Sequence, residues 1–168
     1  MPRLTPAILA PLLLAGCVGA PPIAQPAPQP RFDVFAFFAG PTLGTGRLKK
    51  ILSGTESTLV HGTGRVEGDT LVLDQTVEEG DKPAKHRQWR IRRTGPGRYS
   101  GTLTDASGPV TGEVEGNRLH LSFTMKGGLP TQQWLTLAPD GRSAHNIMTV
   151  TKLGLTVAVL DEDIRKTD

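Results

Sequence analysis

Apolar and polar residues alternate along most of the chain, and short turns interrupt the alternation. Leu119, Leu121 and Phe123 share one side of an extended segment, and the residues between them are polar. A period of two is typical of a β-strand with one buried face. Turns rich in Gly, Pro, Asn or Asp separate such segments. The pattern predicts nine or ten strands, at 43–51, 57–66, 69–78, 85–94, 97–104, 109–115, 118–126, 132–138, 143–151 and 154–164.

The short connections between these segments determine the type of sheet. Parallel strands need crossovers of a dozen or more residues, so the strands must be antiparallel and adjacent to their sequence neighbours. A long meander removes its exposed edges by closing on itself. We therefore expect an all-β fold, an antiparallel up-and-down barrel of the lipocalin or fatty-acid-binding type, with a β-sandwich as the alternative. Residues 32–38 are predicted to form a short helix that caps one end with its phenylalanines.

The N-terminus has the three parts of a secretory signal. Arg3 precedes an apolar stretch, 4–14, which ends in the small residues Ala15 and Gly16 before Cys17. The stretch is shorter than the roughly 20 residues of a spanning helix. The run resembles a bacterial lipobox, which implies that 1–16 is a signal peptide and that Cys17 is lipidated. An ordinary secretory signal followed by an incidental cysteine is the alternative.

The segment after the signal is rich in proline. Residues 17–31 are predicted to be a lipidated cysteine and a tether, which in polyproline II conformation would reach about 40 Å. Residues 32–168 then form the barrel domain. We expect a protein of the bacterial cell envelope that faces the periplasm, with the membrane as partner through Cys17. Because Val18 and not an aspartate follows Cys17, the outer membrane is favoured.

Several short motifs are spread over the domain in a fixed order. They are Phe37-Phe38-Ala39-Gly40, Thr45-Gly46, Arg87-Gln88-Trp89-Arg90-Ile91, Gly97-Arg98-Tyr99-Ser100-Gly101, Asp105, Gly112, Gly116-Asn117 and Met148-Thr149-Val150-Thr151-Lys152-Leu153-Gly154. Together they resemble a family of bacterial lipoproteins, domain of unknown function 3833. The chain departs from that family at Gln132-Gln133-Trp134, where the family has an acidic pair before the tryptophan, so no role of that pair is transferred. The resemblance implies kinship and no particular activity.

The composition argues against several classes of function. The net charge of +3 and the aromatic content of 5% give no reason to expect a nucleic-acid partner. The four histidines, at 61, 86, 120 and 145, are dispersed, whereas a zinc site needs three or four converging ligands. We therefore expect neither a metal nor a cofactor. No G-x-S-x-G motif occurs, the acidic run 161–163 is interpreted as solvated charge, and no catalytic residue is predicted.

The densest charged run, 85–93, contains the most informative basic residue. Strand alternation places Arg87 on the same face as Trp89. If that face is interior, Arg87 needs a partner, which is either a ligand carboxylate or phosphate, an internal salt bridge, or solvent at the rim. The residues predicted to line a ligand pocket are Arg87, Trp89, Leu71, Leu73, Leu119, Leu121 and Phe123.

These observations leave two main hypotheses about function, beside a third, an enzyme of unrecognised type, which would need converging polar groups in a pocket. The first is a non-enzymatic, lipid-anchored barrel that binds a lipid or another amphipathic small molecule in a cavity of several hundred Å³. The second is an envelope assembly or interaction module with a filled core, an exposed apolar patch and a protein partner of unknown identity. We expect the large side chains to belong to the core, with lining of a lipophilic pocket as the alternative; they are Trp89, Trp134, Tyr99, Phe123 and Met148.

Overall fold

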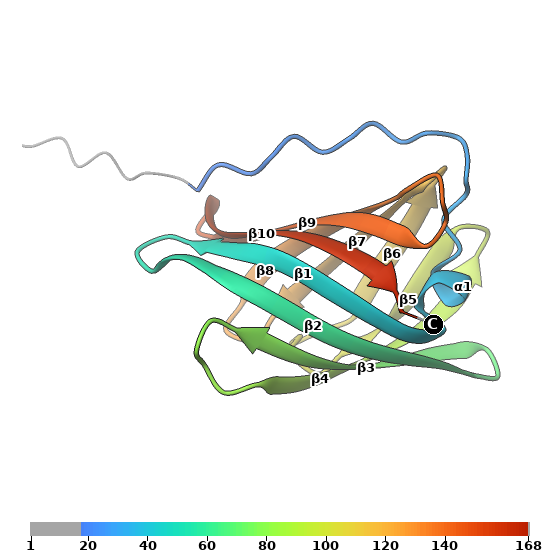
Figure 1. The fold of residues 1–168 in the computed structure, drawn as a ribbon, viewed down its shortest axis with the longest axis horizontal. Helices are drawn as coiled ribbons and strands as arrows, with labels where there is room; N and C mark the ends of the chain where they lie inside the picture. Colours follow the sequence, from blue (N-terminus) through green and yellow to red (C-terminus); the bar gives the residue numbers. More distant parts are fainter. Residues whose placement is uncertain (1–17, 168) are drawn as a thin grey trace, which may run out of the picture.

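Each strand pairs antiparallel with its sequence neighbours, and the last strand pairs with the first. The computed structural model describes residues 18–167, which form a closed ten-stranded barrel with a short helix at one end (Figure 1). β1 closes on β10 from Thr42↔Lys166 to Lys50↔Ala158. The predicted closed meander is confirmed, and the sandwich alternative is wrong. The elements are α1 (Val34–Phe38), β1 (Gly40–Lys50), β2 (Gly54–Glu67), β3 (Thr70–Glu79), β4 (Lys85–Gly95), β5 (Arg98–Leu103), β6 (Val110–Glu115), β7 (Arg118–Met125), β8 (Leu129–Leu137), β9 (Ser143–Lys152) and β10 (Leu155–Lys166).

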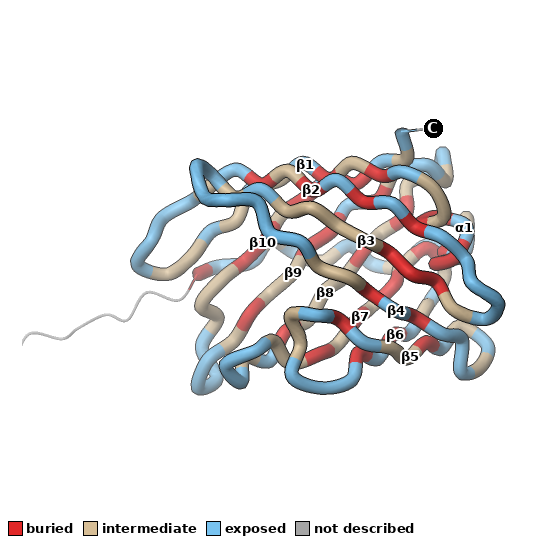
Figure 2. The backbone as a smooth tube through the Cα atoms, turned by 90° about the horizontal axis from the view of Figure 1, so that it is seen from below, coloured by how far each residue is buried: buried red, intermediate tan, exposed pale blue. Residues whose placement is uncertain are grey.

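The inside of the barrel is mainly apolar because alternate residues of each strand point inward. Buried and exposed positions alternate along several strands in Figure 2. Tyr99 and Phe123 belong to the buried core, as predicted, and Met148 packs against it while remaining partly exposed. The prediction for Trp134 is wrong. The neighbouring residue Leu135 points into the barrel, so the side chain of Trp134 points outward. There its ring stacks on that of His120, with 5.0 Å between the ring centroids.

Helix α1 covers one end of the barrel. The side chain of Asp33 caps the helix, because its Oδ1 accepts hydrogen bonds from Phe35 N (2.9 Å) and Ala36 N (3.2 Å). All α1 residues except Ala36 are buried. The helix approaches β2 so closely that a Cβ added at Gly64 would overlap the carbonyl oxygen of Phe38. Glycine on the inner face of β2 therefore lets the helix reach the barrel end.

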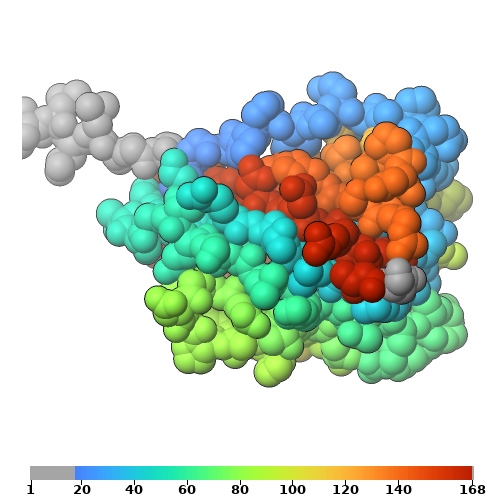
Figure 3. All heavy atoms as spheres, viewed as in Figure 1, coloured from blue at the N-terminus to red at the C-terminus, as the bar shows by residue number. Residues whose placement is uncertain are grey.

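The proline-rich segment lies against the outside of the barrel. Cys17 and the predicted signal peptide are outside the described residues, but residues 18–31 run along the wall (Figures 1 and 3). Residues 18–31 therefore extend along the barrel wall, and they do not act as a spacer of about 40 Å between Val18 and the barrel. Their hydrogen bonds to the barrel join Val18 N to Thr156 O (3.4 Å), Ala27 N to Asn117 Oδ1 (2.7 Å), Asn117 N to Ala27 O (2.8 Å) and Arg118 Nη1 to Ala24 O (3.2 Å).

Replacing Asn117 by alanine tests this attachment. The buried side chain also donates from Nδ2 to Leu137 O at 2.8 Å, so Asn117→Ala removes two hydrogen bonds. We expect a loss of about 1–3 kcal/mol in the free energy of unfolding and faster protease cleavage within residues 18–31. Urea unfolding and limited proteolysis measure the two effects. Thr102→Ala, at an exposed position of β5, is the control; equal cleavage of both variants would contradict the attachment.

Candidate functional site

A small cavity lies inside the barrel, between α1 and the middle of the strands. It has a volume of about 40 Å³. Since about 10–15 Å³ of cavity volume accommodates one water molecule, the cavity has room for about three or four. The prediction of several hundred Å³ is therefore wrong for this conformation, because side chains fill most of the interior. The cavity is lined by Val34, Phe38, Leu71, Leu73, Gln75, Arg87, Trp89, Ile91, Tyr99, Leu119, Leu121, Gln133, Leu135, Glu162 and Ile164.

Most of the residues predicted to line a pocket are brought together here. Arg87, Trp89, Leu71, Leu73, Leu119 and Leu121 all border the cavity. Phe123 does not, although its ring packs edge-on against that of Trp89 at 5.5 Å. The cavity also has polar members from four different strands, and this polar part distinguishes it from an ordinary hydrophobic core.

Arg87 is the basic member of this polar part. Its Nε donates to Gln75 Oε1 at 2.8 Å, and Trp89 Nε1 donates to the same oxygen at 2.9 Å. The guanidinium carbon lies 5.9 Å from the centroid of the Trp89 ring. Burial lowers the pKa of Arg87, against the opposing effect of the charges on Glu162 and Asp105. Among the described residues Arg87 forms no ion pair, so the internal salt bridge considered from the sequence is not formed.

Glu162 and Asn146 face each other across β10 and β9. Their exposed fractions are 4% and 0%, and Asn146 Nδ2 donates to Glu162 Oε2 at 2.8 Å. Within residues 18–167, Glu162 Oε1 and Asn146 Oδ1 are buried without a hydrogen-bond partner. Burial raises the pKa of Glu162, although the bond from Asn146 and the charge of Arg87 act in the opposite direction. Gly44 on β1 leaves room for this carboxyl, because a Cβ there would overlap Glu162 Oε1.

Sequence reasoning missed Glu162 and Asn146. The interpretation of 161–163 as solvated charge is wrong for Glu162, which is buried between the inward positions of Leu160 and Ile164. The alternation Leu160-Glu162-Ile164 carried this signal, because a strand places every second residue on the same face. Just as alternation places Arg87 on the face of Trp89, it places Glu162 on the face of Leu160 and Ile164.

The polar side of the cavity lies behind a part of the barrel wall where β4 and β5 are not paired. β5 pairs with β4 only from Trp89↔Leu103 onward, so the first residues of β4 have little cover on that side. A hollow of about 410 Å³ lies outside this region. Gln75 and Arg87 line both the hollow and the inner cavity. These two side chains therefore separate the interior from the solvent.

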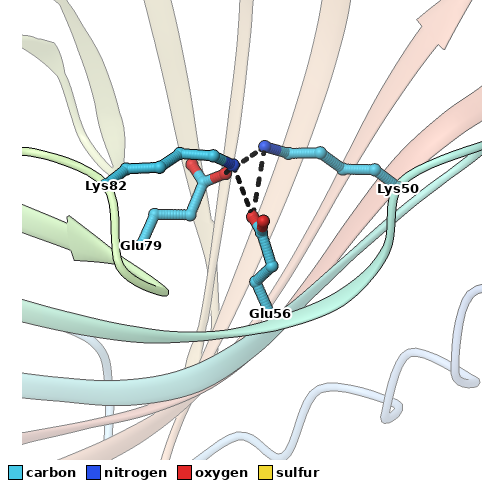
Figure 4. Close-up of polar contacts among 4 residues, drawn as sticks. All are labelled: Lys50, Glu56, Glu79 and Lys82. Carbon is cyan, nitrogen blue, oxygen red and sulfur yellow. Dashed lines mark hydrogen bonds and ion pairs between the residues drawn. The ribbon is translucent and has the colours of Figure 1, made fainter.

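A second polar cluster lies at the end of the barrel opposite α1 (Figure 4). Lys82 Nζ contacts Glu56 Oε2 at 2.7 Å and Glu79 Oε1 at 2.6 Å, and Lys50 also bonds to Glu79. Partial burial by itself would raise the pKa of Glu79. Hydrogen bonds from Lys50 and Lys82 outweigh this effect, and the pKa is lowered from 4.5 to about 2. The cluster thereby ties the β1–β2 hairpin to the β3–β4 loop.

His145 and His86 belong to neither of these two polar clusters. His145 lies on the outer face, 2.9 Å from Asp163 and 3.4 Å from Asp161. His86 contacts Thr76 Oγ1 at 3.1 Å on the outside of the barrel. Within residues 18–167, no three His, Cys, Asp or Glu side chains gather in a way that could hold a metal ion.

Comparison with known proteins identifies the family. A family model described as a protein of unknown function, DUF3833, matches residues 11–166. The chain belongs to the DUF3833 family. The resemblance suggested by the motifs from Phe37-Phe38-Ala39-Gly40 onward is therefore confirmed at the level of the family. No curated protein matches the DUF3833 chain in sequence.

The DUF3833 barrel is similar in structure to a solved protein. This is the S-type phycobiliprotein lyase CpeS from Guillardia theta, with a TM-score of 0.61 and 6% sequence identity. The match covers 80% of the DUF3833 chain and 90% of the lyase. At this identity the similarity concerns the fold alone, which is lipocalin-like.

Replacing Glu162 by glutamine tests the buried carboxyl. A carboxyl whose pKa is raised by folding contributes stability at pH below its unfolded value of 4.5, and loses it as pH rises. We therefore expect wild-type stability to fall as the pH rises above about 4.5, by about 1.4 kcal/mol for each unit of pKa difference. Urea unfolding of Glu162→Gln should show a smaller fall. Glu113→Gln, exposed on β6, is the control, and a wild-type slope in Glu162→Gln would contradict the assignment.

The opposite pH dependence is expected for Glu79. Its pKa is lowered from 4.5 to about 2, so its ion pairs contribute stability above about pH 4.5 and lose it as the pH falls toward 2. The full difference corresponds to about 3 kcal/mol at most. Acid titration of the unfolding free energy should show this loss in the wild type and a weaker one in Glu79→Gln. Glu78→Gln, at the exposed neighbouring position, should behave as wild type.

Proposed function

We propose that this DUF3833 protein is a lipid-anchored barrel that binds an amphipathic molecule with an anionic head group in its interior. The observation that carries the proposal is the unmet hydrogen-bonding capacity around one cavity. Arg87 has no ion pair, and Glu162 Oε1 and Asn146 Oδ1 have no partner among the described residues. Buried polar groups are normally paired, so unpaired ones indicate a missing water or ligand.

The chemistry of the polar groups favours a carboxylate head. Arg87 offers guanidinium N–H donors, which bind carboxylates strongly. The raised pKa of Glu162 favours its protonated form, which can donate a hydrogen bond to an anion. Leucine and aromatic side chains form the rest of the lining and suit an apolar chain. A fatty acid meets both requirements.

Entry of such a ligand requires movement of side chains. The inner cavity holds only about 40 Å³, whereas the hollow on the other side of Gln75 and Arg87 holds about 410 Å³. Displacement of these two side chains would join the spaces at the start of β4. The head group would then replace the Gln75 contact of Arg87 and remain close to Glu162.

The anchor and its location are part of the same proposal. Lipidation at Cys17 would attach the barrel to the bacterial cell envelope, with the outer membrane favoured and the barrel facing the periplasm. Within the described residues, no helix is long and apolar enough to cross a membrane. The proposed role is binding without catalysis.

The nearly filled interior favours a second candidate. An assembly or interaction module does not need a cavity, and about 40 Å³ is close to that condition. In that case a few ordered waters satisfy Glu162 and Asn146. The binding experiment below decides between the two candidates.

Laurate binding to Arg87 variants tests the proposal. In a Trp134→Phe background, Trp89 is the only tryptophan and reports on the cavity through its fluorescence. We expect laurate to change this signal, and Arg87→Met to weaken binding about 10- to 100-fold, the range for a hydrogen bond to a charged group. Arg90→Met is the matched control, because Arg90 is exposed on the outer face of the same strand.

The methyl ester of laurate separates the head group from the chain. Because the ester is uncharged, Arg87→Met should bind it as tightly as the wild type does. Equal laurate affinity in the Arg87 and Arg90 variants would overturn the role of Arg87. Absence of laurate binding, together with no lipid in native mass spectra of detergent-free protein, would favour the interaction module.

A further inference from the structure

Two neighbouring hairpins carry fully exposed leucines at their tips, at the barrel end opposite α1. Leu52 is 100% exposed in the β1–β2 turn, and Leu153 is 95% exposed in the β9–β10 turn. Leu155, next to the second turn, is also exposed. Large apolar side chains at hairpin tips gain nothing from the barrel's own packing, and here they are open to contact from outside the barrel.

The backbone at both tips is unfavourable for leucine. Leu52 has φ 72° and Leu153 has φ 51°, in the left-handed region. Turns of this kind are dominated by Gly, Asn and Asp, because a Cβ clashes with the backbone in that conformation. Among the described residues, they are the only non-glycine residues with positive φ. Strain of this kind is associated with functional positions.

The two tips and the start of the described chain meet at one place on the rim. β1 and β10 are paired, and Ile51 N donates to Val157 O at 2.8 Å. On the adjacent residue, Thr156 O accepts from Val18 N at 3.4 Å. In Figure 1 the described chain begins beside this end of the barrel. Val18 is the residue that directly follows Cys17 in the sequence.

Three lysines lie at the same end of the barrel as this apolar group. Lys49, Lys126 and Lys152 are exposed beside the β1–β2, β7–β8 and β9–β10 turns, and among the described residues they form no ion pair. At the α1 end, by contrast, Arg92, Arg93 and Arg98 pair with Asp69, Asp33 and Glu113. Unpaired lysines beside exposed leucines form a surface typical of binding at the interface of an anionic bilayer.

We infer that the barrel end bearing Leu52, Leu153 and Leu155 docks on an anionic phospholipid bilayer. The leucine tips enter the interface, the three lysines contact head groups, and α1 faces away from the membrane. This inference rests on the proposed lipid anchor, because the anchor would leave the chain beside the same tips. The hydrogen-bonded segment 18–31 supports the orientation, since it leads back along the wall instead of extending away from it.

Depth-dependent quenching tests this orientation in the lipidated full-length protein. The wild type has one cysteine, so when Cys17 is acylated a cysteine introduced at a chosen position is the only free thiol. Leu52→Cys, Leu153→Cys and Val66→Cys are labelled with an environment-sensitive fluorophore in vesicles containing phosphatidylglycerol. Val66 is the matched control, an apolar residue 50% exposed near the α1 end. Because the first two substitutions remove fully exposed side chains, they should leave the fold intact.

If this end docks, nitroxide lipids should quench labels at 52 and 153 at least about twofold more than the label at 66, as for insertion of about 5–10 Å. Replacing phosphatidylglycerol by phosphatidylcholine should reduce this difference. Equal quenching at all three positions, or stronger quenching at 66, would overturn the docking. Labelling of the wild type would show that Cys17 is free, and the anchor would then fail independently of the quenching result.

Discussion

Pairing of β10 with β1 is the interaction on which the rest of the structure depends. It joins the first and last strands, separated by more than a hundred residues, and leaves the sheet without an edge. It also brings Gly44 beside Glu162 and places the end of β1 next to Val157. Both the interior polar group and the rim with the exposed leucines exist only because this pair of strands closes the barrel.

Closure also explains why the interior chemistry is unusual. Arg87 comes from β4 and Glu162 from β10, far apart in sequence, yet both line one small cavity, and Asn146 on β9 is buried beside Glu162. Their burial costs free energy unless hydrogen bonds replace the lost water. Gln75 satisfies part of Arg87, and Asn146 satisfies one oxygen of Glu162. The remaining donors and acceptors give the DUF3833 barrel a chemical preference that its apolar lining alone would not provide.

The interior site and the rim are compatible with one arrangement. A barrel that docks through its leucine tips holds the wall beside β4 close to the membrane, where amphipathic molecules are concentrated. The hollow in front of Gln75 and Arg87 lies on the side wall formed by β2, β3 and β4, and α1 does not cover it. The proposed anchor, docking surface and binding site would then act on the same lipid phase.

Period-two alternation and short turns are local properties, so the strands, their antiparallel order and the shared face of Arg87 and Trp89 could be predicted from the sequence. The same parity contained the burial of Glu162 and the outward position of Trp134, although the residue types suggested the reverse for each. The tertiary structure set the size of the cavity, because volume depends on how side chains from all strands pack. It alone decided that residues 18–31 follow the wall, since Asn117 and Thr156, which hold them, are far away in the chain.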